Sequence, residues 1–177
     1  MYQTTLIENI TILKKNCQLS STPIRGVKFI KLADHQTSDG SFCEISRLTA
    51  NRLNPVPHFI VKQISFSKTL AGIIKAWHYH YHQDDVWYIS NGQKLAIGTL
   101  DLRQNSTTLY RMNITFLNGK SSHLIYIPSG VAHGYATSKT PGFIIYFTNQ
   151  HYNSRSPDEH ELPWDFLGKG LWQTPNR

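Results

Sequence analysis

Residues 77–82 read Trp77-His78-Tyr79-His80-Tyr81-His82, and this stretch gives the strongest structural signal in the sequence. Alternate residues of a β-strand point to the same face, so the three histidines share one face and the aromatic residues share the other. Imidazoles in such a row can bind a metal, act as a general base or hydrogen-bond to water. The stretch therefore predicts a strand with one chemically active face.

Runs of alternating apolar and polar residues continue on both sides of this strand. The alternation has a period of two, and turn-forming pairs such as Asn91-Gly92 separate the runs. The tail that begins near Tyr152 suits a short helix at 156–162. We predict an all-β, single-domain jelly-roll barrel over residues 1–177, with a short C-terminal cap. Its expected strands are 26–31, 41–49, 59–67, 72–82, 85–90, 94–102, 123–127 and 142–148.

Two spaced motifs make this architecture more specific. Residues 72–92 follow the spacing G-x5-H-x-H-x4-D-x6-G, and residues 128–133 follow P-x-G-x-x-H. The pair resembles the two motifs of the cupin superfamily, with Asp85 at the position of the usual glutamate. The resemblance implies a cupin β-barrel. Carried over ligand by ligand, it also implies a divalent metal held by His78, His80, Asp85 and His133.

A second resemblance covers more of the chain. Residues 63–79 are similar to the Q-x-N-x-S…G-x-x-R-G-x-H-x pattern of the dTDP-4-dehydrorhamnose 3,5-epimerase family. Residues 127–135 resemble the I-P-x-G-x-A-H-G-F segment of that family, and Tyr146 with Tyr152 resembles its Y-x5-Y pair. The order and spacing of these pieces hold from about residue 40 to residue 165.

This second resemblance implies a cofactor-free enzyme that acts on a dTDP-4-keto-6-deoxy sugar. His78 would be the base that removes the proton next to the ketone, and Tyr146 would return a proton on the opposite face. Enolate formation acidifies such a proton, so a base with a pKa near neutrality can remove it. The resemblance also implies substrate binding by Phe42, Glu44, Gln63, Lys75, His133 and Tyr152.

Two departures from the family pattern alter the charges of the expected site. Lys75 stands where the family has arginine, which loses the bidentate fork for phosphate. Strand parity also places Lys75 on the face opposite to His78 unless a bulge intervenes. Asp85 stands where the family has lysine, so a positive group expected beside a developing enolate becomes negative. The family's late aspartate, which orients the base, has no clear counterpart in this sequence.

Three kinds of function are therefore open at the level of sequence. The first is a metal-free epimerase or isomerase of nucleotide sugars. The second is a metal-dependent cupin enzyme, either a dioxygenase or a sugar isomerase. The third is a sugar-binding cupin without catalysis, because a fold does not fix a function.

The composition indicates the kind of partner. Lysine and arginine number 18 against 11 acidic residues, a net charge of +7 that suits an anionic substrate. These charges are scattered, without the dense stripe of a nucleic-acid binder. The apolar runs are too short to cross a bilayer and the N-terminus lacks a leader pattern, so we expect a cytoplasmic protein without a membrane partner. The family resemblance implies a homodimer that exchanges N-terminal strands containing residues 42–44.

Overall fold

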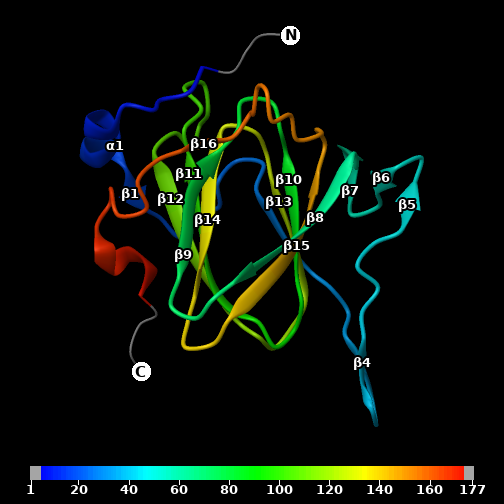
Figure 1. Ribbon diagram of the computed structural model, residues 1–177. Helices are drawn as coiled ribbons and strands as arrows, with labels where there is room; N and C mark the ends of the chain where they lie inside the picture. The colour runs from blue at the N-terminus through cyan, green and yellow to red at the C-terminus, as the bar shows by residue number, and fades with distance from the viewer. Residues whose placement is uncertain (1–4, 174–177) are drawn as a thin grey trace.

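The computed structural model describes residues 5–173, which form two β-sheets that face one another (Figure 1). In sheet order, the six-stranded sheet contains β1 (Gln18–Leu19), β12 (Arg111–Asn118), β11 (Lys94–Asp101), β14 (Val131–Thr137), β9 (Ile74–Tyr79) and β16 (His160–Glu161). The five-stranded sheet contains β2 (Lys28–Lys31), β13 (His123–Ile127), β10 (Asp85–Ile89), β15 (Gly142–Thr148) and β8 (Gln63–Thr69). Two such sheets around a common interior form a jelly roll, which confirms the predicted all-β cupin fold.

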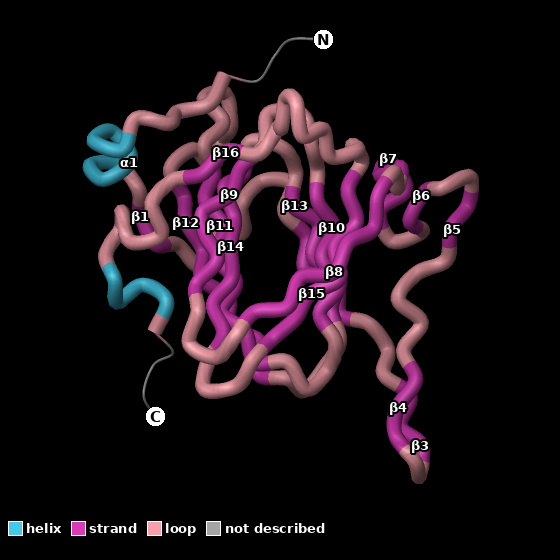
Figure 2. Tube along the Cα trace, viewed as in Figure 1, coloured by secondary structure: helices cyan, strands magenta, loops and turns pink. Residues whose placement is uncertain are grey.

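Shorter elements surround the two sheets. These are α1 (Ile10–Asn16), β3 (His35–Thr37), β4 (Gly40–Phe42), β5 (Leu48–Thr49), β6 (Arg52–Leu53), β7 (Val56–Ile60) and the 3₁₀-helix η1 (Lys169–Trp172). The β3–β4 hairpin extends away from the barrel, as Figure 2 shows. Within residues 5–173, no helix has the length and apolar character needed to cross a membrane.

The core has separate layers on the two sides of the six-stranded sheet. Between the sheets, side chains such as Trp87, Ile97 and Ile125 are buried and pack together. On the outer side, α1 and the C-terminal segment cover the sheet, with Trp77 and Trp172 buried among their side chains. The C-terminal segment is therefore the predicted cap. It covers the outer face of the six-stranded sheet, and the inner face is left for a site.

Several expected elements differ from the observed ones. Residues 156–162 contain no helix in the described chain; instead, β16 adds to the free edge of β9, and Leu162 N donates to Trp77 O at 2.9 Å. The expected strand at 41–49 is interrupted, because β4 ends at Phe42 and β5 begins at Leu48. β12 and β14 were not expected. All residues of β14 are buried and its sequence does not alternate.

Candidate functional site

A cavity of about 1020 Å³ lies between the two sheets, a volume typical of sites for small-molecule ligands. Most of the predicted site residues line it: His78, Tyr146, Gln63, Lys75, His133, Tyr152, His80 and Asp85. Phe42 and Glu44 are not among the residues that line it. Phe42 is 62% exposed on the hairpin, and the Glu44 carboxylate pairs with Arg47 at 3.0 Å.

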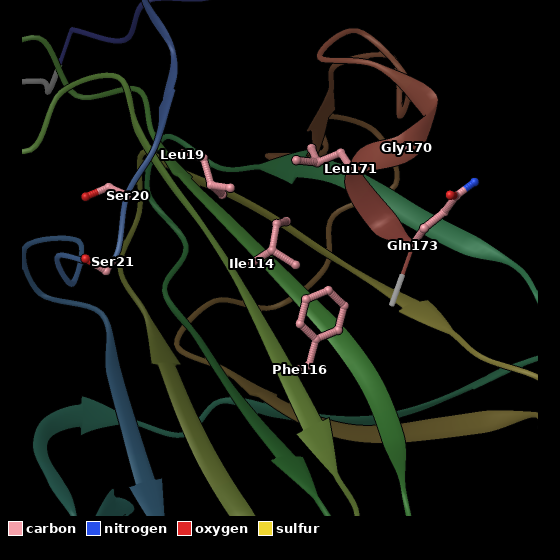
Figure 3. A pocket seen from close by; sticks show the side chains of 8 residues that line it. All are labelled: Leu19, Ser20, Ser21, Ile114, Phe116, Gly170, Leu171 and Gln173. Carbon is pink, nitrogen blue, oxygen red and sulfur yellow. The ribbon is translucent and has the colours of Figure 1, made fainter. Parts of the chain in front are cut away.

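A smaller hollow of about 570 Å³ lies on the outer surface between β1, β12 and η1 (Figure 3). Its lining is formed by Leu19, Ser20, Ser21, Ile114, Phe116, Gly170, Leu171 and Gln173. None of these side chains is a titratable acid or base. The chemistry of this protein is therefore assigned to the cavity between the sheets.

The expected base and acid belong to opposite walls of the cavity. His78 lies on β9 in the six-stranded sheet, and Tyr146 lies on β15 in the five-stranded sheet. Both side chains line the space between the sheets. A sugar ring held between them would present one face to an imidazole and the other face to a phenol.

A bulge in β9 explains how Lys75 and His78 reach the same cavity. The pairing of β9 with β14 shifts, so that His133 is opposite His78 while Tyr135 is opposite Lys75. Two residues of β9 therefore face Gly134 alone, which reverses the strand parity expected from the sequence. A Cβ atom on Gly134 would lie 2.6 Å from Lys75 O, so only glycine fits at this crossing.

Lys75 also connects the two sheets across the cavity. Its Nζ donates to Ser67 Oγ on β8 at 3.0 Å and to Lys68 O at 3.3 Å. The side chain is partly buried, and it places a positive charge at the cavity wall. A charge at this place can attract an anionic group of a ligand.

Two carboxylates that the sequence analysis did not single out lie beside His78. His78 Nδ1 is 3.1 Å from Glu159 Oε1 and 3.3 Å from Glu161 Oε1. Neither contact has hydrogen-bond geometry, so they are electrostatic contacts. β16 places them there, because Glu161 is opposite His78 in the β9–β16 pair. The sequence signal is the acidic run that follows Pro157, which we had expected to be helical.

Asp158 holds the segment that follows β9. Its carboxylate accepts hydrogen bonds from the backbone N–H groups of Tyr81, His82 and Gln83, at 2.8 to 3.0 Å. Its main-chain oxygen accepts a hydrogen bond from His80 Nδ1. One acidic residue of the C-terminal segment therefore fixes both the backbone and the imidazole of the histidine strand.

His80, Asp85 and His133 form a buried polar cluster at the inner end of the site. His133 Nε2 lies 3.6 Å from Asp85 Oδ2, and the Asp85 carboxylate accepts from Trp87 Nε1 at 3.1 Å. Burial raises the pKa of Asp85, against the opposing influence of His80 and these hydrogen bonds. Burial, with a smaller contribution from His80, holds the pKa of His133 well below its ordinary value. His133 is thus a neutral imidazole at neutral pH.

Comparison with known proteins places this fold and site in a family. The family model for dTDP-4-dehydrorhamnose 3,5-epimerase matches residues 21–166, which is most of the chain. The chain belongs to the dTDP-4-dehydrorhamnose 3,5-epimerase family. Membership confirms the resemblance read from the sequence and identifies the chain as an epimerase or isomerase of the dTDP-sugar type.

Individual relatives of this epimerase family agree with the match. The spore coat polysaccharide biosynthesis protein SpsL of Bacillus subtilis is 42% identical over 156 residues, which cover 87% of this chain and 99% of SpsL. NovW, a 4-keto-6-deoxy sugar epimerase of Streptomyces spheroides, has a TM-score of 0.70 at 20% identity, with 87% and 78% of the chains covered. RmlC of Legionella pneumophila, solved with dTDP-4-keto-L-rhamnose, has a TM-score of 0.68 at 22% identity, with 85% and 80% covered. At these identities the two structures show the shared fold.

Proposed function

We propose that this member of the epimerase family inverts carbon centres next to the ketone of a dTDP-4-keto-6-deoxy sugar, as a 3,5-epimerase. The observation that supports this proposal most directly is the placement of His78 and Tyr146 on opposite walls of one cavity. Inversion requires that a proton leave from one face of the ring and return to the other. A base and an acid on facing sheets satisfy that requirement without movement of the barrel.

His78 is the proposed base. The carboxylates of Glu159 and Glu161, which lie beside Nδ1, would stabilise the imidazolium that forms when Nε2 takes the substrate proton. Their negative charge would also favour the proton on Nδ1, which leaves the lone pair on Nε2. These two glutamates therefore take the orienting role for which the sequence offered no aspartate.

Tyr146 is the proposed acid, and a phenol can donate a proton from the face opposite to His78. The remaining cavity residues suit a sugar nucleotide. Lys75 supplies a positive charge for phosphate, while Gln63 and Tyr152 lie together at the wall, with Tyr152 N donating to Gln63 Oε1 at 2.9 Å. His133 contributes a neutral imidazole on the side of the cavity nearest His78.

Exchange of substrate protons with solvent tests this function. The protein is incubated with dTDP-4-keto-6-deoxyglucose in deuterated water, and the sugar is analysed by NMR and mass spectrometry. We expect deuterium at C3 and C5, together with the inverted product. In Tyr146→Phe, deuterium exchange from the His78 side should persist while inversion falls. Absence of deuterium at both carbons in the wild-type protein would contradict the proposal and favour a sugar-binding role.

We also propose that the protein works as a homodimer with an exchanged hairpin. The β3–β4 hairpin projects from the barrel with Phe42 exposed, and a two-stranded hairpin alone is marginally stable. β8 is an edge strand of its sheet, and Ile64 and Phe66 on it are 58% and 61% exposed. A second copy that packs on this edge would cover these side chains and bring Phe42 and Glu44 to the partner's cavity.

Light scattering coupled to size-exclusion chromatography measures the assembly. The wild-type protein should have twice the 20.3 kDa mass of the chain. Phe66→Glu should shift it toward the monomer, because a buried unpaired charge destabilises an apolar interface. Phe116→Glu, at a 39% exposed position on β12 in the other sheet, is the matched control and should leave the mass unchanged. A wild-type monomer would exclude the exchanged dimer.

A further inference from the structure

Three buried side chains on neighbouring strands bring metal-ligating atoms together. His80 follows β9, Asp85 begins β10 and His133 lies in β14, and their ligand atoms all lie within 4.8 Å of one another. The three residues are only 7%, 4% and 3% exposed, respectively. Each also lines the cavity, so a small ion in the cavity can reach them. Nothing in the proposed proton transfer explains why three such groups converge here.

The hydrogen bonds of the two imidazoles at Nδ1 fix which nitrogen atom carries the lone pair. His80 Nδ1 contacts the main-chain oxygen of Asp158, and His133 Nδ1 contacts the main-chain oxygen of Val131 at 2.9 Å. A carbonyl oxygen only accepts, so both Nδ1 atoms must carry the hydrogen. In a neutral imidazole the lone pair is then on Nε2, the nitrogen that enters the cluster. A metal-ligating histidine commonly has such an outer partner on its other nitrogen.

The carboxylate of Asp85 is held in place by two donors. Trp87 Nε1 donates to Oδ2 at 3.1 Å, and Gln83 Nε2 donates to Oδ1 at 2.9 Å. The same Gln83 nitrogen lies 3.4 Å from His80 Nε2, a contact that an ion bound at this lone pair would replace. Each carboxylate oxygen retains a lone pair, and Oδ2 faces His133 Nε2 at 3.6 Å. Acceptor atoms on three side chains therefore lie within 4.8 Å of one another.

We propose that His80, Asp85 and His133 form a binding site for one divalent transition-metal ion. Ligands about 2.1 Å from a tetrahedral metal are about 3.4 Å apart, so the His133–Asp85 separation already suits shared coordination. Two imidazoles and one carboxylate suit zinc, iron, nickel, cobalt or manganese, whereas calcium and magnesium prefer oxygen ligands. Three protein ligands beside an open cavity leave a coordination position for a substrate oxygen.

His78 is outside this metal site, although it is the first histidine of the strand. Its Nδ1 faces Glu159 and Glu161 rather than Asp85. His78 and His80 therefore have different proposed roles, with His78 as the base and His80 as a metal ligand. A site of this kind departs from the four-ligand set that the cupin motifs implied.

The charge of the site gives the ion a role, which rests on the proposed epimerase function. Asp85 stands where the family pattern has a lysine, and a carboxylate alone would repel the enolate formed next to the ketone. A divalent ion bound by one carboxylate and two neutral imidazoles leaves a single positive charge at that place. The site would thus restore the sign of charge that stabilises an enolate oxygen.

Metal binding can be measured without a substrate. Untagged protein of residues 1–177 is treated with chelator, dialysed and titrated with Co²⁺ and Zn²⁺. We expect one ion per chain by elemental analysis, a Co²⁺ absorption spectrum typical of nitrogen and oxygen ligands, and a raised melting temperature. His133→Ala and Asp85→Asn should weaken binding by about 100-fold or more, because they remove ligands rather than outer partners. Circular dichroism verifies that each variant is folded.

Two histidines that line the cavity outside the cluster supply the controls. His82→Ala and His151→Ala should retain the wild-type stoichiometry and the Co²⁺ spectrum. The proposal is wrong if the wild-type protein binds no ion, or if the folded His133→Ala and Asp85→Asn variants still bind one ion with unchanged affinity. Loss of binding in Glu159→Gln but not in Asp85→Asn would also overturn it, because the ion would then belong to His78 and its two glutamates.

The metal site and the epimerase function can fail separately. If the protein binds no ion in the titration but still exchanges deuterium into the substrate, the epimerase function is upheld and the metal site is refuted. One ion per chain lost in the ligand variants, without deuterium exchange in the loaded protein, would uphold the site and refute the epimerase. The metal titration and the deuterium exchange are therefore measured on the same protein preparation.

Discussion

His78→Asn is expected to lower kcat for epimerisation by about 10²–10⁴-fold, the usual contribution of a positioned general base. Asparagine keeps much of the shape of the imidazole but cannot take a proton at neutral pH. The substrate contacts proposed for Lys75, Gln63 and Tyr152 remain, so KM should change little. Deuterium exchange into the substrate should fall by the same factor as kcat, because both need the first proton transfer.

Steady-state kinetics and deuterium exchange of wild type and His78→Asn measure this effect. His123→Asn is the control, since His123 lies on β13 outside the cavity and its ring contacts the nearby Ser121 O at 3.0 Å. Its kcat should equal that of the wild type. Unchanged exchange in His78→Asn would show that another group removes the proton, and the assignment of the base would be lost.

Trp77→Ala is expected to reduce the free energy of unfolding by about 3 kcal/mol, within the usual range of about 3–5 kcal/mol for large buried aromatic residues. Trp77 is fully buried, with its ring centroid 4.8 Å from that of Trp172 and 6.3 Å from that of Phe166. Its Nε1 has no hydrogen-bond partner within residues 5–173, so truncation also removes one unfavourable buried group. That relief places the loss at the lower end of the range.

Urea unfolding followed by circular dichroism measures the loss. Trp164→Ala is the matched control, because Trp164 is 38% exposed and contacts Trp172 Nε1 through its main-chain oxygen, which alanine retains. We expect about 1 kcal/mol or less for the control. Equal losses in the two variants would mean that the Trp77–Trp172 contact does not anchor the C-terminal cap.

Strand parity explains what the sequence could and could not predict about the active face. The predicted barrel is present and His78 lies in β9, but β9 ends at Tyr79, so the strand expected over 72–82 is shorter and His80 and His82 follow it. Lys75 could not be placed by the same rule, because the bulge opposite Gly134 changes parity within β9. A bulge depends on the neighbouring strand, and a single strand's sequence does not contain that information.

The carboxylates beside the proposed base His78 were missed for a related reason. Glu159 and Glu161 lie far from His78 along the chain, and the residues around them were predicted to form a helix. The edge of β9 offers unpaired backbone groups, and pairing with that edge overrides a weak local helix preference. Long-range pairing of this kind is the part of the site that local patterns do not reveal.

The attachment of β16 to β9 has a consequence for the order in which this enzyme becomes competent during its synthesis. His78, Tyr146 and Lys75 all leave the ribosome before Glu159 and Glu161. A nascent chain that ends before Asp158 therefore has the barrel strands that hold His78 and Tyr146. It lacks the carboxylates beside His78 and the main-chain oxygen of Asp158 that contacts His80. The carboxylates beside the proposed base are therefore synthesised after the strands that hold His78 and Tyr146.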